Sequence, residues 1–315
     1  MIKFVKKQKQ RLEKFVVKLS KKIILPGFRG YSLYYVGSFF FKGIQEGAVS
    51  MRASSVAFNL FIAIFPALIF FFSLIPFIPV QNFQYELFSI LAEVLPDSAY
   101  SLLHETISDT ILNQRSSILS IGFFLMLFFA SNGVLSFIEA FNNSYHHVDS
   151  RNWISKRLIS VLLIVIVSVL LLLAISLIVV GNNYFLNFMG DHQFQQKYSS
   201  ALFFVIGVFK WILVIGLYFL AISFLYFLAP AKKSRFRFIT PGAIFATVLQ
   251  VISSLGFAYY VNNFARYNKL YGSIGTIIVV MLLFYITALA LIIGFELNAS
   301  IFSSNKKFSI KRLKK

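Results

Sequence analysis

Six long apolar stretches interrupt the chain, and each is continuous rather than alternating. They cover residues Ser54–Phe77, Ile118–Phe141, Leu158–Val180, Ala201–Ala229, Gly242–Val261 and Ile274–Ile301. Each has roughly the twenty residues that a helix needs to cross ~30 Å of hydrocarbon. A membrane β-barrel would instead show short alternating segments. The pattern therefore predicts an all-α, polytopic membrane protein with six transmembrane helices.

Composition supports the same class. Hydrophobic residues make up 58% of the 315 residues and charged residues only 13%, whereas charge in soluble domains is near a quarter. Residues 1–22 are basic and show no apolar core with a cleavage site, so the first span is expected to act as an uncleaved insertion signal. The chain has no cysteine, which excludes disulfides, thiolate catalysis and cysteine-ligated metals.

The basic residues are concentrated beside every second gap between the spans. Residues 1–53 hold 12 Lys and Arg, 142–157 hold 3, 230–241 hold 4 and 302–315 hold 6, whereas the other gaps together hold 4. Basic loops tend to stay cytoplasmic during insertion. The distribution predicts a multi-pass protein of the plasma (inner) membrane with both termini in the cytoplasm.

Three regions follow from this pattern. Residues 1–53 form a basic cytoplasmic or interfacial segment, 54–301 the six-helix transmembrane domain, and 302–315 a basic cytoplasmic tail. The net charge of +19 is expected to face anionic lipid headgroups at the termini and inner loops, and nucleic acid is not an expected partner.

Amphipathic segments flank the first span. Residues 1–22 have the pattern of a basic surface helix, with a partly disordered tail as the alternative. Tyr31–Val49 is too polar to span and is expected to form an interfacial helix. The outer loop 78–117 contains two predicted short helices, Phe83–Leu95 and Ser98–Leu112.

Ionisable residues inside lipid are costly, so each one suggests a function or a partner. Lys210 lies within the fourth span and either contacts a substrate or ion, or snorkels outward past Tyr198. Arg52, Glu139 and Glu296 share one depth and predict either an Arg–carboxylate cluster or interfacial carboxylates that contact water and loop arginines.

Polar and helix-breaking residues add to this set. Asn59, Asn132 and Asn298 either join neighbouring helices by hydrogen bonds or contribute to a polar path. Pro66 removes a backbone hydrogen bond in mid-span and is expected to kink the first span.

Enzyme signatures are missing from the sequence. The four histidines are not spaced as metal ligands, and the 11 acidic residues are scattered along the chain. Since nuclease chemistry needs carboxylates gathered around metal ions, ribonuclease activity is not expected, and neither is a cofactor.

The last two spans resemble a known family. Tyr271-Gly-Ser-Ile-Gly275, followed by an apolar span and Gly294-Phe-Glu-Leu-Asn-Ala299, is similar to the closing signature of the YihY/virulence factor BrkB family. Tyr226 and Arg52-Ala-Ser-Ser-Val-Ala57 also match, over about residues 30–302. The motif positions with a structural role are Pro66, Pro230, Arg235, Pro241, Gly242, Tyr271, Gly272 and Gly275.

The resemblance implies an integral inner-membrane protein of six helices. The family carries an old ribonuclease label, and the roles suggested for its members are transport, export or lipid handling. We therefore expect a transporter or flippase-like protein for a small solute or lipid. The alternative is a non-transporting envelope or scaffold protein that recruits partners through its basic termini.

Overall fold

The computed structural model describes residues 17–28, 30–74, 116–145, 149–190, 200–231, 238–264 and 273–313. Within these ranges the regular elements are all α-helices, which confirms the predicted class. They are α2 (Leu33–Glu46), α3 (Val49–Leu74), α6 (Ser116–Ser144), α7 (Trp153–Gly190), α9 (Ser200–Leu228), α10 (Pro241–Phe264) and α12 (Ser273–Leu313).

Six of these helices are long and apolar enough to cross a membrane. Their apolar parts are Val49–Phe71, Ser117–Ser144, Trp153–Ala174, Gly207–Leu228, Pro241–Val261 and Ile277–Phe302. Large apolar side chains also lie on the outer surface, as at Phe124 (69% exposed) and Leu255 (67% exposed). Such exposure is favourable in lipid, where the solvent is as apolar as the side chains.

Several helices extend beyond the apolar stretches that predicted them. Helix α3 begins at Val49, ahead of Ser54, and α12 continues to Leu313, past Ile301. The apolar run marks the part that faces lipid, whereas helical hydrogen bonds continue into polar sequence. No Gly or Pro occurs in 302–313 to stop α12.

Some predicted segments lie outside the described residues. These are residues 1–16 of the predicted surface helix 1–22 and residues 78–115 of the predicted outer loop 78–117, so the two short loop helices are not described. Helix α2 lies within the predicted segment Tyr31–Val49, and its location at the membrane interface stays a prediction.

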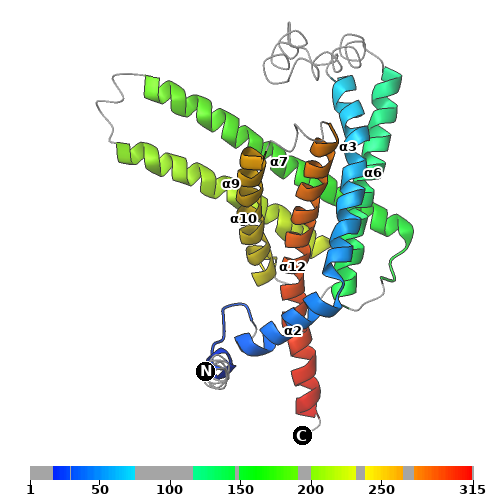
Figure 1. Cartoon of the computed structure of the whole chain (residues 1–315), viewed down its shortest axis with the longest axis vertical. Coiled ribbons are helices and arrows are strands. Elements are labelled where there is room, and N and C mark those ends of the chain that lie inside the picture. Colours follow the sequence, from blue (N-terminus) through cyan, green and yellow to red (C-terminus); the bar gives the residue numbers. More distant parts are fainter. Residues whose placement is uncertain are drawn as a thin grey trace. The chain divides into compact units, whose positions relative to one another are not determined.

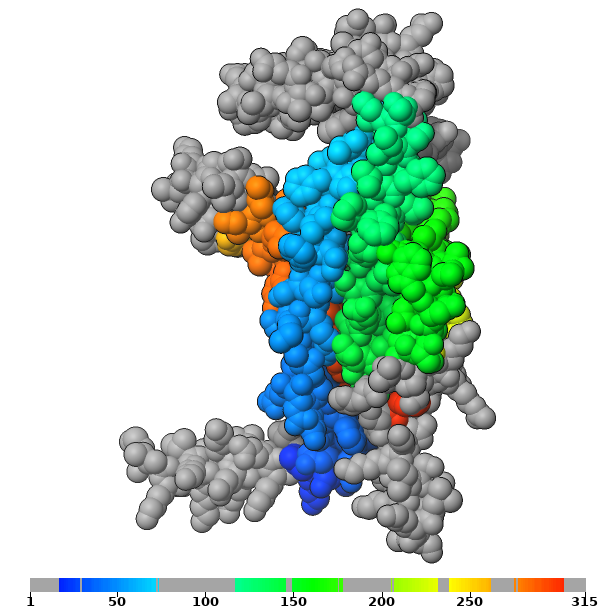
Figure 2. Space-filling view, turned by 90° about the vertical axis from the view of Figure 1, so that its right-hand side faces the viewer, coloured from blue at the N-terminus to red at the C-terminus, as the bar shows by residue number. Residues whose placement is uncertain are grey.

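The chain divides into two compact units, with boundaries inside α3 and α6. The second unit is Ala57–Gly133. Its described part is a pair of helices that lie side by side in Figure 2. Glycines of α6 allow this close approach: a Cβ on Gly122 would lie 3.2 Å from the Cα of Phe70, and one on Gly133 would lie 2.7 Å from Leu60 Cδ2.

The first unit contains residues 1–56 and 134–315. Figure 1 shows α7 and α9 as neighbouring antiparallel helices and α2 crossing α12. Helices α10 and α12 approach closely where Gly242 faces Gly294. The Tyr226 hydroxyl of α9 donates a hydrogen bond to the carbonyl of Leu291 at 2.5 Å, which joins α9 to the same contact.

An aromatic cluster forms the core beside this contact. The rings of Phe141 and Phe295 stack with centroids 4.2 Å apart. Tyr226 and Tyr145 each meet Phe295 edge-on, at 5.2 and 5.3 Å. Edge-on and stacked pairs add to the energy of burial, so the cluster fixes the positions of α6, α9 and α12 relative to one another.

Replacing Gly242 by Ala should destabilise the protein, because its Cβ would lie 2.5 Å from Asn298 Cγ and against the Gly294 carbonyl. We expect a loss of about 1–3 kcal/mol, the usual cost of overpacking. Gly256→Ala on the same helix is the control, since its Cβ would meet no atom of the described residues within 4 Å. Thermal unfolding in detergent measures both, and equal melting temperatures would contradict the packing described.

Candidate functional site

The turn between α2 and α3 positions Arg52. The amide of Gly47 donates to the carbonyl of Gly43 at 2.8 Å and ends α2. Ala48 then adopts a φ of 47°, a left-handed conformation that costs a non-glycine residue roughly 1–2 kcal/mol. Helix α3 begins at once, so Arg52 lies in its first turn. The side chain of Arg52 lies against Gly47: a Cβ added to Gly47 would be 2.8 Å from Arg52 Nη2.

Arg52 connects three helices through its guanidinium group. Nη2 donates to Glu296 Oε1 on α12 at 2.6 Å. Nη1 donates to the carbonyl of Ala140 at 2.6 Å and to Ser144 Oγ at 2.7 Å, both on α6. The side chains of Arg52 and Glu296 are only 9% and 4% exposed. The predicted contact between these two charges is therefore present as a buried ion pair.

Ser144 completes a closed arrangement with the ion pair. Its hydroxyl lies 2.7 Å from Glu296 Oε1 and 3.2 Å from the Ala140 carbonyl, and it donates to one of these acceptors. Hydrogen bonds of this kind offset the desolvation of the carboxylate. Arg52 Nε is buried with no hydrogen-bond partner among the described residues, so the arrangement leaves one donor unsatisfied.

Two cavities adjoin the ion pair. One, of about 230 Å³, lies between α2 and α12 and includes Phe39, Gly43, Ser144 and Glu296 in its wall. A Cβ on Gly43 would lie 2.8 Å from Glu296 Oε2. Because glycine has no Cβ, this carboxylate oxygen is not covered by residue 43 and lies on the cavity wall.

The second cavity is larger, about 730 Å³, and has Arg52 in its wall. Its other charged groups are Glu46, Glu139, Asp149 and Lys156. The two cavities share Glu46, Gly47 and Asn143. The ion pair thus lies between two polar spaces near the ends of α2, α6 and α12.

Asn298 caps the start of α10. Its Oδ1 accepts from the amide of Gly242 at 2.9 Å, and its Nδ2 donates to Thr240 Oγ1 at 2.9 Å. Free amide groups at a helix N-terminus need such partners. Asn298 therefore joins α12 to α10 two residues beyond Glu296.

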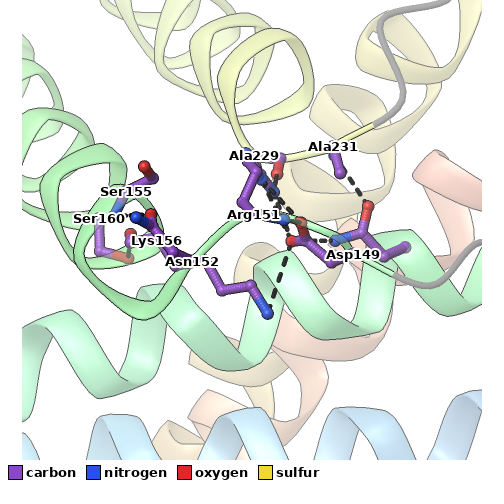
Figure 3. Close-up of polar contacts among 9 residues, drawn as sticks. Asp149, Arg151, Asn152, Ser155, Lys156, Ser160, Ala229 and Ala231 are labelled. Carbon is purple, nitrogen blue, oxygen red and sulfur yellow. Dashed lines mark hydrogen bonds and ion pairs between the residues drawn. The ribbon is translucent and has the colours of Figure 1, made fainter.

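A second polar cluster, which sequence reasoning missed, lies between α6 and α7 (Figure 3). Arg151 donates to both carboxylate oxygens of Asp149, from Nε at 3.0 Å and from Nη2 at 2.8 Å, and Nη2 also donates to the Ala229 carbonyl at 2.7 Å. Asn142 donates to Asp149 at 2.9 Å and accepts from the amide of Ala231 at 2.9 Å. The cluster links the α6–α7 connection to the end of α9.

Burial raises the pKa of Asp149, but the hydrogen bonds and positive charges of Arg151 and Lys156 outweigh it and lower the pKa below its usual value of 3.8. Asp149 is therefore ionised at neutral pH. The only signal of this cluster in the sequence was that Asp149 and Arg151 lie two residues apart in the short gap between the second and third spans. That spacing gives no indication of the contact with Ala229.

The other predicted residues do not join the ion pair. Glu139 is exposed and lines the larger cavity. Lys210 is half-buried on α9, with Nζ 5.8 Å from the ring centroid of Trp211. Asn59, Asn132 and Pro66 belong to the second unit, where Pro66 lies inside α3.

The motif residues have separate locations. Pro230 and Gly275 are buried, and Pro241 is the first residue of α10. The Pro241 ring lies against Gly27, whose φ of 87° is in the left-handed region, and a Cβ there would be 2.6 Å from Pro241 Cγ. Arg235, Tyr271 and Gly272 lie outside the described residues.

Six apolar helices and a buried ion pair among them define an integral membrane protein. A family model described as Virulence factor BrkB matches residues 40–314, and the chain belongs to this family. The ribonuclease-like protein YfkH of Bacillus subtilis (strain 168) is 32% identical over 264 residues, which cover 84% of this chain and 93% of that protein.

A UPF0761 membrane protein of Haemophilus influenzae (strain 86-028NP) is 21% identical over 271 residues, which cover 86% of this chain and 96% of that protein. A UPF0761 membrane protein of Pseudoalteromonas translucida (strain TAC 125) is 35% identical over 81 residues, covering 26% of this chain and 27% of that protein. No solved structure matches the chain. The membrane class and the family expected from the closing motif are thus confirmed.

Proposed function

We propose that the protein is a flippase-like transporter that moves a membrane lipid between leaflets. In this proposal the Arg52–Glu296 ion pair closes one end of the path. The observation that carries it is the position of the pair, buried between two polar cavities at the ends of α2, α6 and α12.

The energetics of the pair favour a role beyond stability. A buried ion pair contributes little more than well-packed apolar residues of the same size, and charged residues within membrane helices usually mark a substrate or ion path. Glu296 Oε2 lies beside Gly43, and Glu296 lines the smaller cavity. One face of the pair therefore remains available to a ligand.

A phosphate-bearing substrate can break the Arg52–Glu296 ion pair by taking the place of the Glu296 carboxylate. Phosphate and carboxylate both accept paired hydrogen bonds from a guanidinium group, so a lipid phosphate that enters the larger cavity can replace Glu296 as the partner of Arg52. Lys156 lines the same cavity, where its Nζ lies 3.9 Å from Asp149 Oδ2. Breaking the pair without such a replacement would cost ~3–5 kcal/mol, which couples opening to the presence of substrate.

We also propose that the protein lies in the plasma membrane with both termini cytoplasmic, because 25 of the 30 basic residues are in the two termini and the two gaps assigned to that side.

The orientation can be tested with single-cysteine variants. The chain has no cysteine of its own, so a thiol reagent labels the protein only at the introduced residue. Asp191→Cys should react with an impermeant maleimide added to intact cells, and Lys315→Cys only after lysis. Equal labelling at both positions in intact cells would contradict the orientation.

Glu296→Gln should speed lipid movement at least about tenfold, equivalent to ~1.4 kcal/mol, because Arg52 loses the charged partner with which it closes the path. The measurement uses proteoliposomes that contain fluorescent phosphatidylglycerol and follows quenching by dithionite. Glu46→Gln is the control: its carboxylate lines both cavities but belongs to an exposed ion pair with Lys42.

Gly43→Ala separates transport from folding, because it places a methyl group beside Glu296 Oε2 and leaves both charges in place. We expect slower movement with a melting temperature near that of the parent. Parental rates in both Glu296→Gln and Gly43→Ala would contradict the proposed function.

Two other functions give different results. A scaffold function is supported by the extension of α12 to Leu313 into the basic tail, and it predicts that removal of 306–315 abolishes the cellular phenotype while lipid movement is unchanged. Ribonuclease activity predicts metal-dependent cleavage of RNA by the purified protein, which we do not expect.

A further inference from the structure

A third cavity lies away from the ion pair, between α7, α9 and α10. It has a volume of about 650 Å³, within the range of ligand pockets. Its wall is formed almost entirely by apolar side chains, among them Leu171, Ala174, Trp211, Ala221 and Leu255. Leu171 and Leu255 are 53% and 67% exposed, so the rim of the cavity belongs to the surface that faces lipid.

A positive charge stands at one end of this cavity. Lys210 directly precedes Trp211, a wall residue, and its Nζ lies 5.8 Å from the centroid of that ring. It is the eleventh residue of α9 (Ser200–Leu228), in the half of the helix that begins at Ser200. A long Lys side chain in this half of a span can extend its ammonium group toward the lipid headgroups at that end.

We propose that this cavity binds one acyl chain of a phosphate-bearing membrane lipid, with the lipid phosphate paired to Lys210. A hydrocarbon chain gains little by moving from the bilayer into an apolar cavity, because both surroundings are equally apolar. Selection among lipids must therefore come from the headgroup. The charge of Lys210 favours an anionic lipid over a zwitterionic one.

The antiparallel order of the helices fits such a lipid. Helices α7 and α10 run antiparallel to α9, so each lining segment has one end on the Lys210 side of the cavity. The wall residues at that end are Trp211 on α9, Ala174 on α7 and Leu255 on α10. The wall residues at the opposite end are Ala221, Val167 and Gln250. The headgroup would thus be at the Lys210 end and the chain would extend along α9 toward Ala221.

This inference rests on the proposed lipid handling and gives it a binding site. The two can fail separately, because binding at Lys210 and movement that depends on Glu296 are measured by different assays. Lipid bound in the cavity without any movement across the bilayer would leave the site in place and remove the transport proposal.

The test uses the full-length protein in phosphatidylcholine nanodiscs. Phosphatidylglycerol with a diazirine in one acyl chain is the probe, and the same modified chain on phosphatidylcholine is the comparison. After photolysis, peptide mass spectrometry should locate the phosphatidylglycerol adducts in 167–174, 211–221 and 250–255 and give a higher yield than phosphatidylcholine. Lys210→Gln should lower the phosphatidylglycerol yield about fivefold, and Lys210→Arg should retain it.

Matched variants separate the site from general effects. Ala221→Phe fills the cavity and should lower both yields, whereas Ile252→Phe, on α10 but outside the cavity wall and 62% exposed, should leave them unchanged. Lys42→Gln removes an exposed cation elsewhere and should also have no effect. Equal yields for the two lipids in the parent, an unchanged yield in Lys210→Gln, or adducts confined to other helices would overturn the proposal.

Discussion

The buried pair of Arg52 and Glu296 joins α3, α6 and α12. Arg52 reaches α6 through Ala140 and Ser144, and α12 through Glu296, all within 2.6–2.7 Å. Both side chains are buried, so separating the charges without new partners is costly. The turn at Gly47 and the absence of side chains at Gly43 and Gly47 leave room for the pair.

One short segment of α12 makes contacts with three other helices of this unit. Gly294 allows the close approach of α10, and Phe295 stacks on Phe141. Glu296 pairs with Arg52, and Asn298 caps α10. Because a helix presents successive residues on different faces, one hexapeptide can contact α10, α6 and α3 at once. This explains in physical terms why the closing motif combines a glycine, an aromatic residue, an acid and an amide.

The apolar stretches were sufficient to predict the helices, since lipid requires long apolar segments. Shared depth left open whether Arg52, Glu139 and Glu296 form a cluster or remain at the interface, because depth does not fix the rotation of a helix; the structure pairs Arg52 with Glu296 and leaves Glu139 exposed. The cluster of Asn142, Asp149 and Arg151 depends on a connection meeting the end of α9, which no periodicity encodes. The apolar cavity beside Lys210 was equally hidden, because its wall has the same composition as a lipid-facing surface.

The mutual dependence of the two charges can be measured with a double-mutant cycle. The free energy of unfolding in detergent is compared for the parent, Arg52→Met, Glu296→Leu and the double variant. Each single variant leaves one buried charge without its partner and should lose ~3–5 kcal/mol, whereas the double variant should return close to the parent. A double variant that loses the sum of the two single effects would show that the residues act independently, and would contradict the role given to the pair.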